Sequence, residues 1–180
     1  MDEKSTTDKR GLISWCLYDW ANSAFPTVII TFVFATYFTS SVAADKVSGT
    51  AQWGYAMSLS AFAVAIAAPI FGAIADNAGR RKPWLGVFTL ACVIASAFLY
   101  LVEPDPSFAL MALVLAGLAN FAFETGMVFY NAMLPGLAPE SHVGRISGWG
   151  WGLGYFGGLC CLALTLVGFV QPEVPWFGLE

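Results

Sequence analysis

Long apolar runs, from which every lysine and arginine is excluded, dominate this sequence. Each of five runs has about 19 residues or more, which at 1.5 Å per residue lets a helix cross a hydrocarbon core of about 30 Å. The runs cover residues 13–43, 53–75, 84–102, 108–134 and 146–170. No run alternates like a strand, and an open sheet leaves backbone groups unpaired in lipid. We therefore expect an all-α membrane protein with five transmembrane helices.

The composition excludes an ordinary water-soluble domain. The chain is 58% hydrophobic and 11% charged, against about 25% charged residues in a typical globular domain. A domain of 180 residues has too little interior to hide that much apolar surface. The lipid bilayer is therefore the first partner that we expect. The net charge of −4 gives no reason to expect nucleic acid as a second one.

The basic residues predict the orientation of the chain. Only Lys46 follows an odd number of spans, whereas the other seven basic residues lie on the opposite face: Lys4, Lys9, Arg10, Arg80, Arg81, Lys82 and Arg145. Because positive loops stay inside, the N-terminus is expected in the cytoplasm. We interpret the chain as a multi-pass protein of a bacterial inner (plasma) membrane.

This topology divides the chain into three parts. Residues 1–12 are expected to form a cytoplasmic tail, residues 13–170 the five-span domain, and residues 171–180 an extracytoplasmic segment leading to a sixth helix. The first span is longer than one crossing needs, so we expect it to tilt, bend at Pro26 or project into water. Residues 41–44 also resemble a signal-peptide cleavage site, but the apolar run before them is about twice the usual length.

No set of residues in the sequence suits enzyme chemistry. His142 is the only histidine and has no cysteine or paired carboxylate near it in sequence. The four cysteines all fall within apolar spans, where small buried thiols are a more common role than a metal or redox pair. Nucleophile-elbow and Walker motifs are missing as well, and the glycine pattern in span five follows no strand. We expect no catalytic residue, no metal site, no cofactor and no enzyme activity.

The fourth span carries the polar residues Asn120, Glu124 and Asn131, which helical spacing places on one face. Glu124 lies near the middle of the span, where an ionisable group must be protonated, paired or beside water. It is therefore a candidate proton carrier or substrate ligand, with the two asparagines beside it. The alternative is an interhelical hydrogen bond that only holds the bundle together.

The first span begins with a second polar face. Asp19 and Asn22 enter the membrane together with Ser23 and Thr27, and polar faces at this depth line cavities or helix contacts. We include Asp19 and Asn22 among the candidates for a substrate or proton pathway. Asp19 could instead complement the helix dipole, with the tryptophans around it forming an interfacial aromatic belt.

The fifth span is rich in glycine. Gly150, Gly154 and Gly158 recur every four residues and form a stripe that lets another helix approach closely. The second span offers a similar stripe in Ala61, Ala65, Ala68 and Gly72. Such stripes suit helices that rock against one another, although static dimerisation explains them equally well.

Four motifs resemble one transporter family. The loop GAIADNAGRRK is similar to the loop between the second and third helices of the major facilitator superfamily at Gly72, Asp76, Gly79, Arg80 and Arg81, whereas Asn77 stands where a basic residue is usual. DWANSAF, FYNAMLP and GLGYFGG resemble the vacuole effluxer branch of that superfamily. Together the motifs span nearly the whole chain.

The resemblance implies part of a secondary active transporter that moves a small solute, with amino acids as a suggested substrate. The proton is expected as a coupling ion because of the central position of Glu124. It also implies twelve spans in two halves, so that this chain is an N-terminal fragment whose partner is the missing C-terminal half. In the superfamily, contacts of the Asp76 position hold the cytoplasmic side shut, which makes Gly72, Asp76, Gly79, Arg80 and Arg81 a latch. A non-transporting membrane scaffold or assembly subunit remains the alternative.

Overall fold

Five helices long and apolar enough to cross a membrane make up the computed structural model. They cover Lys9–Val42, Lys46–Ile74, Arg81–Leu101, Pro106–Leu137 and Glu140–Val170. The structure describes residues 9–171 and Trp176, and no strand occurs among them. This confirms the all-α class and the five spans. Most of the tail at 1–12 and of the segment at 171–180 lies outside the described residues.

The chain forms two compact units, each of which is described by itself. Unit 1 combines Met1–Val33 with Pro135–Glu180, and unit 2 is Phe34–Leu134. Large apolar side chains lie exposed on the outer faces, among them Phe62 at 63% and Ile70 at 59%. An exposed apolar face is what a helix presents to lipid, since hydrocarbon is its solvent.

Unit 1 pairs the first part of span one with span five. Helix α1 (Lys9–Asn22) is followed by the π-helix η1 (Pro26–Phe32), and both pack against α6 (Val143–Thr165), which continues as the π-helix η7 (Leu166–Val170). The α-helical pattern is interrupted at Ser23, just before Pro26, whose ring nitrogen cannot donate a hydrogen bond. Beyond it the turns widen, and Val33 N–H donates to the Val28 carbonyl at 2.9 Å. Two short 3₁₀ turns, Leu134–Gly136 and Glu140–His142, precede α6.

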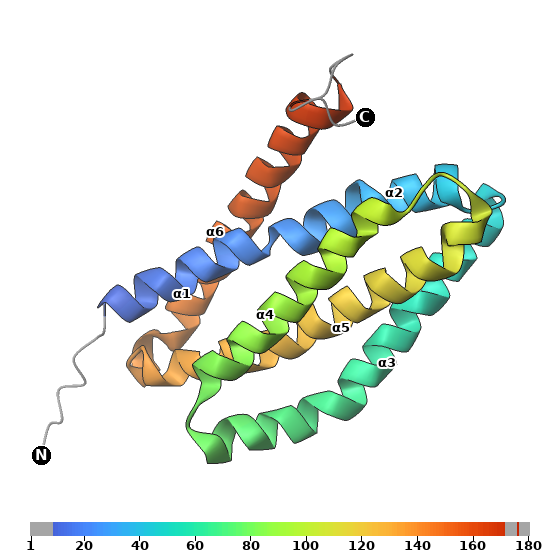
Figure 1. Ribbon diagram of the computed structural model, residues 1–180. Coiled ribbons are helices and arrows are strands. Elements are labelled where there is room, and N and C mark those ends of the chain that lie inside the picture. Colours follow the sequence, from blue (N-terminus) through green and yellow to red (C-terminus); the bar gives the residue numbers. More distant parts are fainter. Residues whose placement is uncertain (1–8, 172–175, 177–180) are drawn as a thin grey trace, which may run out of the picture. The chain divides into compact units, whose positions relative to one another are not determined.

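Unit 2 is built around α5 (Ala109–Met133), which packs against both α3 (Lys46–Ala78) and α4 (Arg81–Phe98) (Figure 1). The second part of span one, α2 (Phe34–Tyr37) and the π-helix η2 (Phe38–Val42), packs on α3. Small side chains form much of the buried face of α5: Ala112, Ala116, Ala119 and Ala122 are at or below 5% exposure. Such side chains let neighbouring helices approach closely in lipid.

Polar groups hold the turns that follow spans one and three. The Tyr37 hydroxyl donates to the Val102 carbonyl at 2.8 Å, just after the 3₁₀ turn Leu99–Leu101. Asp45 caps α3 by accepting from Val47 N–H at 3.0 Å and Ser48 N–H at 2.9 Å. The bond from the Ser48 hydroxyl, together with these amides, holds the pKa of Asp45 below its usual range. Asp105 caps the 3₁₀ turn Pro106–Phe108 in the same way, and its pKa is lowered by Ser107.

An aromatic cluster joins the three helices of unit 2 near the turn between α3 and α4. Phe71 of α3 lies edge-on to Phe88 of α4, with ring centroids 5.0 Å apart. Trp84 and Phe129 stack with centroids 5.9 Å apart and an interplanar angle of 9°. Phe129 is fully buried. Aromatic pairs contribute about 0.5–1.5 kcal/mol each beyond their buried area, so this cluster holds the ends of α3, α4 and α5 together.

Candidate functional site

The polar face of α5 is divided between a helix contact and an open surface. The Asn120 side-chain amide donates to the Ser60 hydroxyl of α3 at 3.1 Å, and that hydroxyl donates to the Gly117 carbonyl at 3.0 Å. Glu124 and Asn131, in contrast, are exposed. Asn120 therefore contributes to packing between α3 and α5. Glu124 and Asn131 have exposed side chains that can contact a solute, water or another helix.

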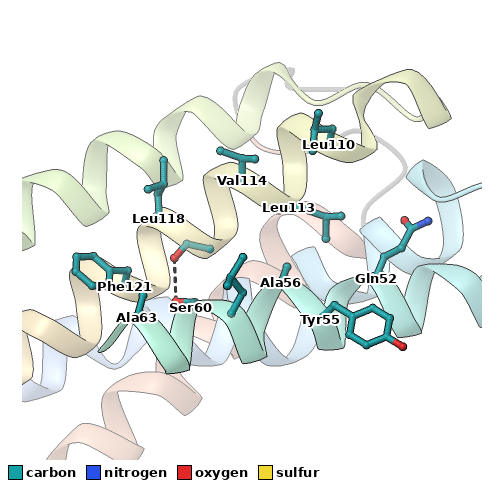
Figure 2. A pocket seen from close by; sticks show the side chains of 12 residues that line it. Gln52, Tyr55, Ala56, Ser60, Ala63, Leu110, Leu113, Val114, Leu118 and Phe121 are labelled. Atoms are coloured by element: carbon teal, nitrogen blue, oxygen red, sulfur yellow. Dashed lines mark hydrogen bonds between the residues drawn. The ribbon is translucent and has the colours of Figure 1, made fainter. Parts of the chain in front are cut away.

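A groove of about 500 Å³ runs along α3 and α5. Figure 2 shows the hydrogen bond from Ser60 that joins the two helices, with Gln52 and Tyr55 further along α3. The remaining lining is apolar: Ala56, Leu59, Ala63, Leu110, Leu113, Val114, Gly117, Leu118 and Phe121. An almost wholly apolar groove within two membrane spans suits hydrocarbon more than a polar solute.

The contact face of α3 differs from the one expected from its small residues. Ala61 and Ala65 are exposed, and no atom of another residue lies within 4 Å of a Cβ built on Gly72. The contact with α5 runs through Ser60, and a Cβ on Gly117 would lie 3.9 Å from the Ala56 carbonyl oxygen. The two stripes are one residue apart, which turns the face by about 100°. The contact between α3 and α5 therefore does not use the stripe from Ala61 to Gly72, whose role in packing stays a prediction.

The polar face of α1 and η1 lies against the glycines of α6. A Cβ placed on Gly154 would lie 2.6 Å from Asp19 Oδ2 and 2.8 Å from Ser23 Oγ. One on Gly158 would lie 2.5 Å from Thr27 Oγ1. On this face every larger side chain would collide with span one, so glycine is required for the observed approach.

Asp19 is enclosed by this contact. Its residue is 7% exposed, and Trp15, one turn earlier, is 4% exposed and covers Gly150. Asn22, in the last turn of α1, is half-buried. The structure thus brings Asp19 together with Ser23, while the other membrane carboxylate, Glu124, lies in unit 2 on an exposed face.

The loop after α3 is organised by one arginine. Gly79 adopts a left-handed conformation, with φ at +60°, and ends α3. Arg81 Nη1 donates to the Ala132 carbonyl in the last turn of α5 at 2.6 Å, and its Nη2 lies 3.5 Å from Asp76 Oδ1. Arg80 is exposed. Arg81 therefore links the ends of three helices, a long-range contact that sequence spacing alone does not reveal.

Comparisons with known proteins identify the family to which this sequence is similar. Residues 39–144 match the family described as "Vacuole effluxer Atg22 like". An uncharacterized MFS-type transporter of Bacillus subtilis, YxiO, is 38% identical over 147 residues, which are 80% of this chain and 34% of the relative. An uncharacterized protein of Aquifex aeolicus is 25% identical over 162 residues, which are 90% of this chain and 40% of the relative.

The chain thus spans between a third and two fifths of the length of these curated relatives. No solved structure is significantly similar to it. The family match covers more than half of the chain and includes the loop with Asp76 and Arg81 as well as span four. The chain therefore belongs to the Atg22-like vacuole effluxer family of MFS-type membrane proteins.

Proposed function

We propose that the chain supplies the first five spans of a secondary active transporter, which moves a small solute across the membrane by alternating access. Family membership and the five apolar helices support this proposal. The solute is a small metabolite, with amino acids as the class to test first, and the proton is the proposed coupling ion. The remaining spans would come from sequence beyond these 180 residues, as the greater length of the relatives suggests.

Glu124 carries the proposal. It lies within span four, Pro106–Leu137, and remains exposed although a charge at the centre of a bilayer costs at least about 2.5 kcal/mol. A carboxylate exposed only to lipid would be unfavourable, so we expect this face of α5 to line a water-filled cavity. Asn131 lies two helical turns away on the same face and would also contact solute there. Asp19 and Asn22 of span one are the proposed second group of this pathway.

The test is transport by the full-length protein in proteoliposomes. Glu124→Gln keeps the shape of the side chain and removes its charge, so we expect uptake driven by a pH gradient to fall by about 100-fold or more, the lower end of the effect of a positioned proton-transfer group. Phe121→Leu, one turn away on the apolar groove, is the matched control and should keep the wild-type pH dependence. Unchanged pH dependence and affinity in Glu124→Gln would make this residue structural.

We also propose that the loop acts as a latch on the cytoplasmic side. Asp76 is 75% exposed and its distance from Arg81 is 3.5 Å, so this pair leaves the carboxylate available for another contact. A helix N-terminus from the rest of the transporter would suit it, since helix N-termini attract carboxylates. Arg80 is exposed and equally available, while Gly72 and Gly79 keep the ends of the loop free of side chains.

A further inference from the structure

Asp19 is a carboxylate without a neutralising partner. It is 7% exposed, and among residues 9–171 no hydrogen bond or ion pair joins its carboxylate to a donor. The lysines and arginines of the observed spans all lie near span ends. An ionised carboxylate enclosed in this way costs several kcal/mol unless a positive charge accompanies it. The fold therefore requires either a proton or another cation at Asp19.

Hydroxyl oxygens follow this carboxylate along the face that α6 covers. Asp19 Oδ2 and Ser23 Oγ both approach the position that a Cβ of Gly154 would take, at 2.6 Å and 2.8 Å, so the two oxygens are at most 5.4 Å apart. Thr27 Oγ1 lies one turn further along, where it donates to the Ser23 carbonyl at 2.8 Å. Carboxylate, hydroxyl and carbonyl oxygens are the ligands that hard cations prefer.

The backbone at this point is interrupted. Helix α1 ends at Asn22, Ser23 forms a turn, and Pro26 offers no N–H to the carbonyl four residues before it. Interrupted membrane helices supply carbonyl oxygens to coupling ions in secondary transporters. The residues of α6 that lie against these oxygens are Gly154 and Gly158, which are both buried and have no side chain to bring hydrocarbon or a titratable group.

We propose that Asp19, Ser23 and Thr27 form a binding site for a sodium ion between α1–η1 and α6. A single carboxylate matches a monovalent ion, because magnesium and calcium sites ordinarily use more carboxylates or bound water. No His/Cys/Asp/Glu cluster for a transition metal occurs among the described residues, and none is needed for an alkali ion. Sodium binding at this site does not depend on the proposed transport function. Only the role of sodium as a coupling ion, alongside the proton or in its place, rests on that function.

The test measures ion binding without transport. Thermal unfolding of the full-length protein in nanodiscs is followed in sodium chloride and in choline chloride at equal ionic strength. A ligand that binds only the folded state raises the midpoint with its concentration. We expect a saturable rise with sodium for the wild type, its loss in Asp19→Asn, and a half-saturating concentration about tenfold higher in Ser23→Ala, as for the loss of one ligand of an ion.

Two controls match these variants. Thr31→Val removes a hydroxyl from the same π-helix, at an exposed position, and Asp105→Asn removes an exposed carboxylate; both should respond to sodium like the wild type. If Asp19→Asn does not fold, Ser23→Ala and Thr27→Val provide the decision in the same assay. The proposal is wrong if sodium gives no shift beyond choline, if the shift survives in both Asp19→Asn and Ser23→Ala, or if only acidification stabilises the protein. Because this assay measures no transport, its outcome does not decide the proposed transport function. That function is tested separately by Glu124→Gln.

Discussion

Arg81 and Arg80 are neighbours of equal charge with different surroundings. The guanidinium of Arg81 is 31% exposed and binds the Ala132 carbonyl, where the negative end of the α5 dipole adds to the attraction. Arg80 is exposed to solvent. Their positions in the sequence predict the same two roles for both, as topology signals and as members of the latch. At the scale of single residues, Arg81 is the one that joins the helices of unit 2.

We predict that Arg81→Gln lowers the free energy of unfolding of the full-length protein by about 1–2 kcal/mol, because a charged hydrogen bond to a partly buried carbonyl is lost. Arg80→Gln should change it by less than about 0.5 kcal/mol, as expected for an exposed side chain. Denaturation in detergent micelles, followed by tryptophan fluorescence, measures both. Arg80 and Lys82 keep a positive loop in Arg81→Gln, so insertion is retained.

Asp76→Asn separates the latch from this packing role. The exposed ion pair contributes only about 0 to 1 kcal/mol, so stability should remain close to that of the wild type. Cytoplasmic cysteine accessibility should nevertheless rise, since a contact formed in one state biases the equilibrium between two. Equal losses of stability in Arg80→Gln and Arg81→Gln, or unchanged accessibility in Asp76→Asn, would contradict this division of roles.

At the scale of elements, hydropathy was sufficient to locate the spans but not to orient their faces. Every expected span overlaps one of the observed helices, because length and apolarity alone decide whether a helix crosses lipid. In span two, however, small residues recur on two faces, and α5 contacts the one with Ala56 and Ser60. Lipid and a neighbouring helix are equally apolar, so the sequence cannot choose between them. The Ser60–Asn120 bond and the apolar groove escaped prediction for this reason.

The glycine face of α6 gives the element-scale prediction. Gly154→Ala places a Cβ 2.6 Å from Asp19 Oδ2, and overpacking of this kind costs about 1–3 kcal/mol. Gly157→Ala should cost more, because its Cβ meets the backbone carbonyl of Trp20, which cannot rotate away. Thermal unfolding of the full-length variants measures both.

Gly152→Ala is the matched control on the same helix. No atom of another residue lies within 4 Å of its added Cβ, so it should leave the unfolding temperature unchanged or raise it slightly, since alanine favours the helix over glycine. Equal losses at Gly152 and Gly154 would show that glycine is needed for helix flexibility and not for the contact with span one.

At the scale of the whole molecule, the helix pairs repeat a pattern. Span one packs on span five in unit 1, and span four packs on span two in unit 2. If spans one and four are corresponding members of two inverted three-helix repeats, then spans two and five correspond as well, and both pairs are the same contact. Each pair also buries a polar side chain at the helix contact, Asp19 in one and Ser60 in the other. The two units therefore agree with the repeat architecture that the family implies.

The topology of five crossings is the last prediction. Spans two, three and four separate Ala44 from Ser141, and both residues are exposed at the ends of helices. With the four native cysteines replaced by alanine, a cysteine at Ser141 should react with an impermeant maleimide only after the membrane is opened, whereas one at Ala44 should react in intact cells. The reason is the placement of Arg80, Arg81 and Lys82, since each charge carried to the bilayer centre costs about 2.5–3.5 kcal/mol. Labelling of both positions from one side would require an even number of crossings between them, and would contradict the placement of the latch and of Lys46 on opposite faces.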